Sequence, residues 1–189
     1  MEIALIGAGG HAKMVAEMLA ATGYRVVAYC DRRPAPWLDA PRIDDDARIV
    51  ELPAKVGVAL GVGGIDPGGL ARRRRLLESA LADGRRAPAI IHPSAVIGRG
   101  ARIAAGAQVL AGAIVQPGAS IGVAAIVNSG ALVEHDSEIG DGSHVCPRAV
   151  VLADCRVGTD CMIGAAAVVL PGNIVPTATL VPALTRYPR

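Results

Sequence analysis

The chain has 189 residues and a formal net charge of +2, and 52% of its residues are hydrophobic whereas only 2% are aromatic. Neither the basic surface nor the stacking aromatics of a nucleic-acid-binding protein are present, so this class is excluded. No apolar run continues long enough without Gly, Pro or charge to cross a bilayer, and no targeting segment is recognisable at the N-terminus. Four cysteines without a CxxC pair are typical of a reduced protein. We therefore expect a cytoplasmic protein without membrane insertion.

Residues 1–86 alternate between strand and helix patterns. The segments EIALIG, RVVAYCD and KVGVALGVGG indicate strands, and KMVAEMLAATG has helical spacing. A second helix, DPGGLARRRRLLESALADG, is expected to begin at Asp66 or Pro67. This alternation predicts a small N-terminal α/β domain, half of a Rossmann-like fold, with a junction near ADGRRAP. The four arginines at 72–75 are interpreted as a solvated helix face.

A glycine loop, GAGGHA, follows the first strand and begins the first helix. The N–H groups at such a helix N-terminus suit a phosphate, and Asp31 at the end of the second strand suits a ribose or a base. Because only half of a doubly wound domain is present, a single nucleotide or a nucleotide sugar fits better than a dinucleotide. The alternative is a turn that packs helix on strand without a ligand. That alternative leaves His11 and the glycines at 61, 63 and 64 without a role.

Residues 91–186 divide without remainder into sixteen blocks of six, each beginning with Ile or Val. The fifth residue of a block is almost always Ala, Ser, Cys or Thr. An uninterrupted hexapeptide repeat predicts a left-handed parallel β-helix, in which three blocks make one triangular coil. Residues 87–189 should therefore form a second domain of a little over five coils. First and fifth positions point inward, which places Cys155 and Cys161 in the core.

One polar stretch, VEHDSEIGDGSH, interrupts this aliphatic region. His135, His144 and Asn128 occupy positions that point away from the coil interior, and Asp136 can orient the imidazole of His135 and raise its basicity. The two histidines are half a coil apart, so they leave different sides of the prism and converge on one substrate most easily across a subunit interface. Two alternatives stay open. A zinc site lacks a third histidine nearby, and a Cys146 nucleophile lacks an electropositive environment.

These motifs resemble those of the NeuD/PglD-type bacterial sugar acyltransferases, which include nucleotide-amino-sugar N-acetyltransferases and sialic-acid O-acetyltransferases. GAGGHA, IHPSAVIG, VNSGALVEHD and GDGSHV occur in the family's order over nearly the whole chain. The resemblance implies direct acetyl transfer from acetyl-CoA to the amine of a nucleotide-linked amino sugar, in a homotrimer with sites between subunits and without a metal. The alternatives are O-acetylation of a sugar of the sialic-acid type and a non-catalytic solenoid scaffold.

The resemblance also implies roles for particular residues. His135 matches the general base and Asp136 the acid that raises its pKa, while His144 matches a residue near the acetyl thioester and Asn128 a polar residue at the sugar end. The positions that match nucleotide-sugar contacts are Gly9, Gly10, His11, Asp31 and Gly61. The positions whose backbones match those holding the pantetheine arm of CoA are Ala165 and Ala183.

Two departures from the family pattern affect these implied roles. Arg32 stands where many relatives have a second acid after the one matching Asp31, so the identity of the nucleobase stays open. The C-terminal sequence LVPALTRYPR also differs from the family's usual ending. Arg186 and Arg189 are the candidates there to bind the CoA phosphates, and a frayed tail is the alternative.

Overall fold

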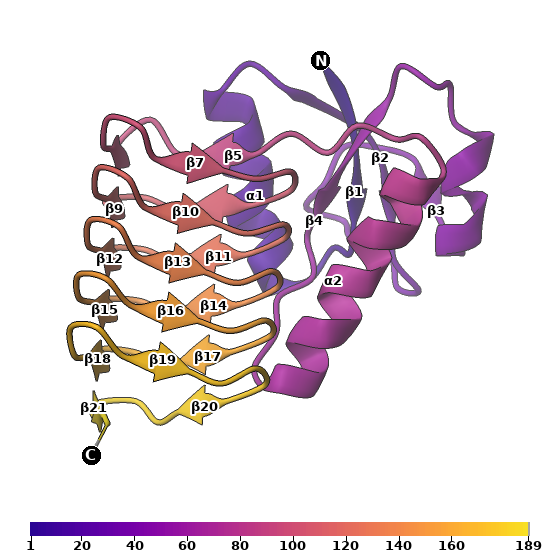
Figure 1. Ribbon diagram of the computed structural model, residues 1–189. Helices are drawn as coiled ribbons and strands as arrows, with labels where there is room; N and C mark the ends of the chain where they lie inside the picture. The colour runs from indigo at the N-terminus through magenta and orange to yellow at the C-terminus, as the bar shows by residue number, and fades with distance from the viewer. Residues whose placement is uncertain (189) are drawn as a thin grey trace.

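The computed structural model describes residues 1–188, without the side chains of residues 46 and 47. An N-terminal α/β unit lies beside a β-solenoid whose coils stack from the N-terminal to the C-terminal end of the repeat region (Figure 1). No helix in the described part of the chain is both long and apolar enough to cross a membrane.

The α/β unit has a four-stranded parallel sheet in the order β3-β2-β1-β4. Its elements are β1 (Glu2–Ile6), α1 (Gly10–Ala21), β2 (Arg25–Cys30), β3 (Arg42–Ile43), the 3-10 helix η1 (Asp46–Glu51), β4 (Gly57–Leu60) and α2 (Pro67–Ala82). The three predicted strands and both predicted helices are confirmed. Asp66 is the N-cap of α2, because its carboxylate accepts a hydrogen bond of 2.7 Å from the N–H of Gly69. Strand β3 and helix η1 were not predicted, since elements this short carry no measurable periodicity.

The residues of β1 alternate between the two faces of the sheet, and the largest apolar cluster on each face includes residues of β1. Ile3 and Leu5 pack with α1 and with Leu110 and Ile126 of the solenoid. On the opposite face, Ile6 packs with α2 and with Ala124 of the solenoid, among others. Both clusters thus continue into the solenoid, so the α/β unit is seated on it through a shared core.

The solenoid consists of three parallel sheets whose strands pair with neighbours eighteen residues away, as Ile126 does with His144. The domain-facing sheet contains β5 (Ile90–Ile91), β8 (Gln108–Val109), β11 (Ile126–Val127), β14 (His144–Val145), β17 (Met162–Ile163) and β20 (Leu180–Val181). The aliphatic sheet contains β6 (Val96–Ile97), β9 (Ile114–Val115), β12 (Leu132–Val133), β15 (Val150–Val151), β18 (Val168–Val169) and β21 (Arg186–Tyr187). The polar sheet contains β7 (Arg102–Ile103), β10 (Ser120–Ile121), β13 (Glu138–Ile139), β16 (Arg156–Val157) and β19 (Ile174–Val175). These pairings confirm the predicted solenoid of three blocks per coil and about five coils.

The solenoid core consists of first-position and fifth-position residues, as predicted. Cys155 and Cys161 are fully buried in it and form no disulfide. At the corners between residues 100 and 184 the backbone turns at the fourth position, where φ is positive, as at Gly130 (+64°) and Asp136 (+60°). Glycine adopts this left-handed conformation without steric penalty, which explains its frequency at the fourth position.

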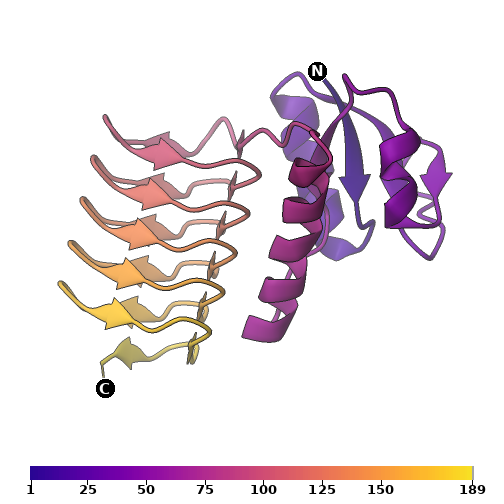
Figure 2. The same ribbon diagram turned by 45° about the vertical axis from the view of Figure 1, so that its right-hand side comes forward.

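The interpretation of arginines 72–75 as a solvated face is wrong for two of the four. Helix α2 runs along the stack of coils (Figure 2), so one of its faces meets a solenoid corner instead of water. Arg73 is fully buried, and Arg74 forms an ion pair with Asp160 at 2.9 Å. Arg72 and Arg75 are exposed. Helical periodicity within one segment could not reveal this contact, because the partner surface is formed by residues fifty to ninety positions later.

Candidate active site

His135 and Asp136 lie on the corner between β12 of the aliphatic sheet and β13 of the polar sheet. The Nδ1 of His135 is 2.9 Å from the Oδ2 of Asp136, and since an ionised carboxylate can only accept, the ring proton lies on Nδ1. This leaves the lone pair of Nε2 free to take a proton. The hydrogen bond to Asp136, with the nearby charges of Asp136, Glu134 and Asp154, raises the pKa of His135. The side chain of His135 is 58% exposed, so this base is open to a partner.

His144 and Asn128 form a second polar group, on the domain-facing side. The Nδ2 of Asn128 lies 2.9 Å from the Nε2 of His144, and the Oδ1 of Asn128 accepts the N–H of Ser129 at 2.7 Å. The amide orientation is thereby fixed, so Asn128 donates and the Nε2 of His144 accepts. The His144 proton is then on Nδ1, which faces the carbonyl of Gly64 at 3.4 Å.

Both residues point away from the coil interior, as predicted, but the α/β unit covers them and they are buried. Burial lowers the pKa of His144 to about 4. His144 is therefore neutral near pH 7, with a partner at each ring nitrogen.

His11 is also held by a hydrogen bond to a solenoid side chain, that of Gln108, which the sequence motifs did not indicate. Its Nε2 is 2.8 Å from the Oε1 of the fully buried Gln108, whose Nε2 donates to the carbonyl of Leu60 at 2.7 Å. His11 thus donates through Nε2 and keeps the Nδ1 lone pair. The sequence does contain a signal for Gln108, because Gln108 and His144 occupy the same outward position of the repeat, two coils apart in the domain-facing sheet.

A cleft of about 690 Å³ separates the start of α2 from these two groups. It is lined by His11, Gly63, Gly64, Ile65, Asp66, Gly68, Gly69, Arg72 and His144. The cleft therefore brings together His11 from the glycine loop and His144 from the solenoid, as a site for a polar ligand between the two units requires. His135 does not line it.

A second cleft, of about 550 Å³, lies at the carboxyl ends of β1, β2 and β4. Apolar residues line it together with Asp31, Arg32, Arg33, Asp44 and Asp45. This is the edge of a parallel sheet at which nucleotides bind in open α/β folds. Gly7 and Val62 line this cleft, and His11 and Gly63 line the larger one. The two glycine segments, residues 7–10 and residues 61–64, therefore connect the two clefts.

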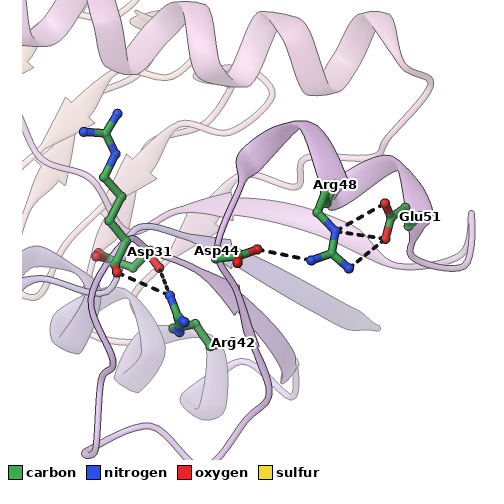
Figure 3. Close-up of polar contacts among 6 residues, drawn as sticks. Asp31, Arg42, Asp44, Arg48 and Glu51 are labelled. Atoms are coloured by element: carbon green, nitrogen blue, oxygen red, sulfur yellow. Dashed lines mark hydrogen bonds and ion pairs between the residues drawn. The ribbon is translucent and has the colours of Figure 1, made fainter.

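The carboxylate of Asp31 is bonded to the backbone on both sides. It accepts the N–H of Ala8 and the N–H of Arg33, each at 2.9 Å. Burial alone would raise the pKa of Asp31, but these bonds and the charges of Arg33 and Arg42 outweigh it and lower the pKa. Figure 3 shows Arg42 beside Asp31, where it donates to the Asp31 carbonyl, and the adjacent ion pairs of Arg48 with Asp44 and Glu51.

The predicted glycine positions differ in what surrounds them. Among the described residues, added Cβ atoms at Gly9 and Gly10 would meet nothing within 4 Å, and no side chain caps the start of α1. The N–H groups there are available to an anion. At Gly61 a Cβ would lie 2.2 Å from the Gly7 carbonyl oxygen, so Gly61 allows two loops to pack and is not open to a ligand. A side chain at Gly61 would separate the loops.

Ala165 and Ala183 are exposed and stacked, with the N–H of Leu184 bonded to the Ala165 carbonyl at 2.9 Å. They share with Asn128 the corner between the domain-facing and aliphatic sheets. His135 lies at the other edge of the aliphatic sheet, so one chain does not bring it to these residues. Arg186 is exposed in β21, and Arg189 lies outside the described residues.

Two alternative sites can be compared with the geometry. Burial raises the pKa of the Cys146 thiol to about 11, which disfavours its thiolate as a nucleophile. Within residues 1–188 no group of three or more His, Cys, Asp or Glu side chains is close enough to hold a metal ion.

Comparisons with known proteins agree with this architecture. Residues 2–67 match the PglD N-terminal domain, and residues 136–171 match the bacterial transferase hexapeptide family (six repeats). No curated protein matches the chain significantly.

Among the solved structures that resemble the chain, two illustrate the similarity over nearly its whole length. The acetyltransferase domain of PglB from Neisseria gonorrhoeae is 31% identical with a TM-score of 0.87, over 96% of this chain and 88% of that one. PerB from Caulobacter crescentus, in complex with CoA and GDP-perosamine, is 30% identical with a TM-score of 0.69, over 98% of this chain and 93% of that one.

A half-Rossmann unit seated on a hexapeptide solenoid, with a polar cleft between them, defines a hexapeptide-repeat acyltransferase. The chain belongs to the PglD-type family of these acetyltransferases.

Proposed function

We propose that the protein transfers an acetyl group from acetyl-CoA to the amine of a nucleotide-linked amino sugar, with His135 as the general base. The observation that carries this proposal is the His135–Asp136 pair, an exposed imidazole whose pKa a carboxylate raises. Two similar structures support the substrate classes. The PglB domain binds acetyl-CoA in one structure, and the PerB complex contains CoA and GDP-perosamine. Acetyl-CoA as the donor also favours a cytoplasmic location.

The clefts suggest how the nucleotide sugar lies on the α/β unit. The smaller cleft suits the nucleoside, the open N–H groups of Gly9 and Gly10 suit the diphosphate, and the larger cleft suits the sugar. The Nδ1 of His11 can accept a hydrogen bond from the sugar. Because both nitrogens of His144 have partners, we infer that it orients Asn128 and the Gly64 loop and does not transfer a proton during the reaction.

In the proposed reaction the sugar nitrogen attacks the thioester carbonyl carbon while the Nε2 of His135 takes the proton from that nitrogen. The tetrahedral intermediate collapses as the C–S bond breaks, and the imidazolium returns its proton to the leaving thiolate, which departs as CoA. Asp136 stabilises the imidazolium in the interval. Holding both substrates in attack geometry contributes several kcal/mol to lowering the barrier, and general-base catalysis adds about 10²–10⁴-fold.

A homotrimer would complete the site. The outward positions of the first five strands of the aliphatic sheet hold Val96, Ile114, Leu132, Val150 and Val168, and the sixth holds Arg186. Val96 is 57% exposed. Three such sheets packed around a threefold axis would bury this column. Each copy's His135 corner would then adjoin the neighbour's corner that carries Asn128, Ala165 and Ala183. This arrangement brings together the two half-sites that a single chain keeps apart.

The test is release of CoA thiol from acetyl-CoA in the presence of UDP- and GDP-linked amino sugars and free sialic acid. Release with a nucleotide amino sugar, lost in His135→Ala, is the expected result. Activity with sialic acid alone would instead assign O-acetylation. If no CoA is released with any of these substrates and acetyl-CoA does not bind, a non-catalytic scaffold is the remaining function.

Mixed oligomers test whether the site is shared between copies. His135→Ala subunits keep an intact cleft, and Asn128→Ala subunits keep an intact base. Co-refolded mixtures should recover part of the activity if each site uses two chains, and none if each chain has a complete site.

A further inference from the structure

Arg73 is a fully buried arginine at the junction of the two units. Its Nε donates to the carbonyl of Val62 at 2.9 Å, and its Nη1 donates to the carbonyl of Ala124 on a solenoid corner. Its Nη2 is buried and has no hydrogen-bond partner among the described residues. The guanidinium therefore connects the loop after β4 to the solenoid with one donor group left over.

Arg74 and Arg85 have partners that balance their positive charge, whereas Arg73 has no such partner among the described residues. Arg74 pairs with Asp160 and Glu78. Arg85 is buried too, but it donates to five carbonyls, three of which, from Ile49, Val50 and Leu52, are at the end of η1, where the helix dipole is negative. Arg73 contacts only two carbonyls and no carboxylate in the described chain. A buried cation without a counter-charge is costly, so a bound anion would stabilise it.

The position of Arg73 indicates where such an anion would lie. Val62, which it contacts, is in the glycine segment that lines both clefts. That segment touches the first glycine loop, because a Cβ on Gly7 would lie 2.5 Å from the Cγ2 of Val62. The pKa of His11 and of His144 is lowered mainly by burial, and the charge of Arg73 lowers both further. Arg73 is therefore hydrogen-bonded to the backbone at Val62, where the two glycine segments meet. Because Arg73 is buried, water screens its electric field only weakly.

We propose that Arg73 is the counter-charge for the diphosphate of the nucleotide substrate, acting through the glycine segments from the buried side. This inference rests on the proposed function, because it places a nucleotide diphosphate at the start of α1. Arg72, which lines the open cleft, is exposed and screened. A buried charge near a diphosphate should change the affinity by about tenfold or more.

The test compares ligands that differ only in phosphate charge. Calorimetry, without acetyl-CoA, would measure the affinities of uridine and guanosine, their monophosphates and their diphosphates. In the wild-type protein the diphosphate should bind most tightly. Arg73→Gln should lose about tenfold in affinity for the diphosphate and little for the nucleoside, whereas Arg73→Lys should keep most of the preference. Arg85→Gln is the matched control, since it removes a buried arginine whose contacts stay inside the α/β unit.

Equal losses for nucleoside and diphosphate in Arg73→Gln would overturn the proposal, as would a wild-type protein without preference for diphosphates. If Arg73→Gln does not fold, a titration of wild-type protein with inorganic pyrophosphate answers the question by nitrogen-15 NMR. The Nε–H resonance of Arg73 should shift while that of Arg85 stays, and an unshifted Arg73 resonance contradicts the proposal. Failure of the acetyl-transfer proposal is recognised separately, by absence of CoA release while diphosphate binding persists.

Discussion

At the scale of single residues, the position of Asp136 combines a backbone requirement with a chemical one. It occupies the fourth position of a corner, where φ is +60°, and there its carboxylate lies 2.9 Å from His135. Glycine is the commonest residue at this position, and Asp and Asn are the side chains that tolerate it best. An acid next to the proposed base is therefore compatible with the solenoid turn.

Asp136→Asn keeps this backbone conformation and removes the negative charge. His135 must be neutral to accept a proton, so the acidic limb of the kcat/KM profile reports its pKa. Because Asp136 raises that pKa, the limb should move to lower pH in Asp136→Asn, and the plateau rate should fall as the base weakens. CoA release measured from pH 5 to 9 would show both effects. An unmoved limb would mean that the limb reports a group other than His135 and would contradict its role as the base.

The lowered pKa of His144 predicts how the stability of the fold depends on pH. Its folded-state pKa of about 4 lies below the ordinary value of 6.5, so the unfolded chain binds more protons between these values. Stability is therefore lost as the pH falls from about 6.5 towards 4. Between pH 7.5 and 5.5 this one group should remove about 1 kcal/mol from the free energy of unfolding. His144→Gln, which keeps an acceptor for Asn128, should lose that much less over the same interval in urea titrations. Parallel losses in both proteins would contradict the assignment.

At the scale of elements, the sequence and the structure agree best where a pattern is local and repeated. The first and fifth positions of the hexads predicted the solenoid core, including Cys155 and Cys161, because each position sees the same environment in every coil. The site was less predictable. Gln108, Arg73 and the covering of His144 depend on contacts between elements far apart in sequence, and no periodicity within one element encodes them.

The corners also predict how the solenoid can be stabilised. Ala178 is an exposed fourth-position residue with φ of +57°, a conformation that strains any side chain with a Cβ. Ala178→Gly should raise the free energy of unfolding by about 0.5 kcal/mol, because relief of strain exceeds the entropy that glycine loses on folding. Ala111→Gly is the control, since Ala111 is exposed at a third position and is not among the positive-φ residues. It should lower stability by a similar amount, and a loss in both variants would show that the corners are not strained.

At the scale of the whole molecule, the three sheets of the solenoid differ in what their outward residues meet. The α/β unit covers much of the domain-facing sheet, and residues such as Arg102, Glu138 and Arg156 give the polar sheet a surface suited to water. The aliphatic sheet is left with a column of Val, Ile and Leu side chains that no other element of the described residues covers. In the proposed trimer the two edges of this sheet would carry the two half-sites, so assembly and catalysis would depend on the same face.

Leu132→Glu tests that dependence. Leu132 points outward from the middle of the aliphatic sheet, so the substitution leaves the core of each chain intact. In the proposed trimer three glutamates would approach one another in an apolar contact, and their desolvation and repulsion should prevent assembly. Light scattering should then give the mass of a monomer, with acetyl transfer lost because His135 no longer meets the neighbour's cleft. Ser120→Glu, at the equivalent outward position of the polar sheet, should leave both mass and activity unchanged. A monomeric Leu132→Glu protein that retains full activity would place the complete site within one chain, and a fully active trimer would place the contact elsewhere.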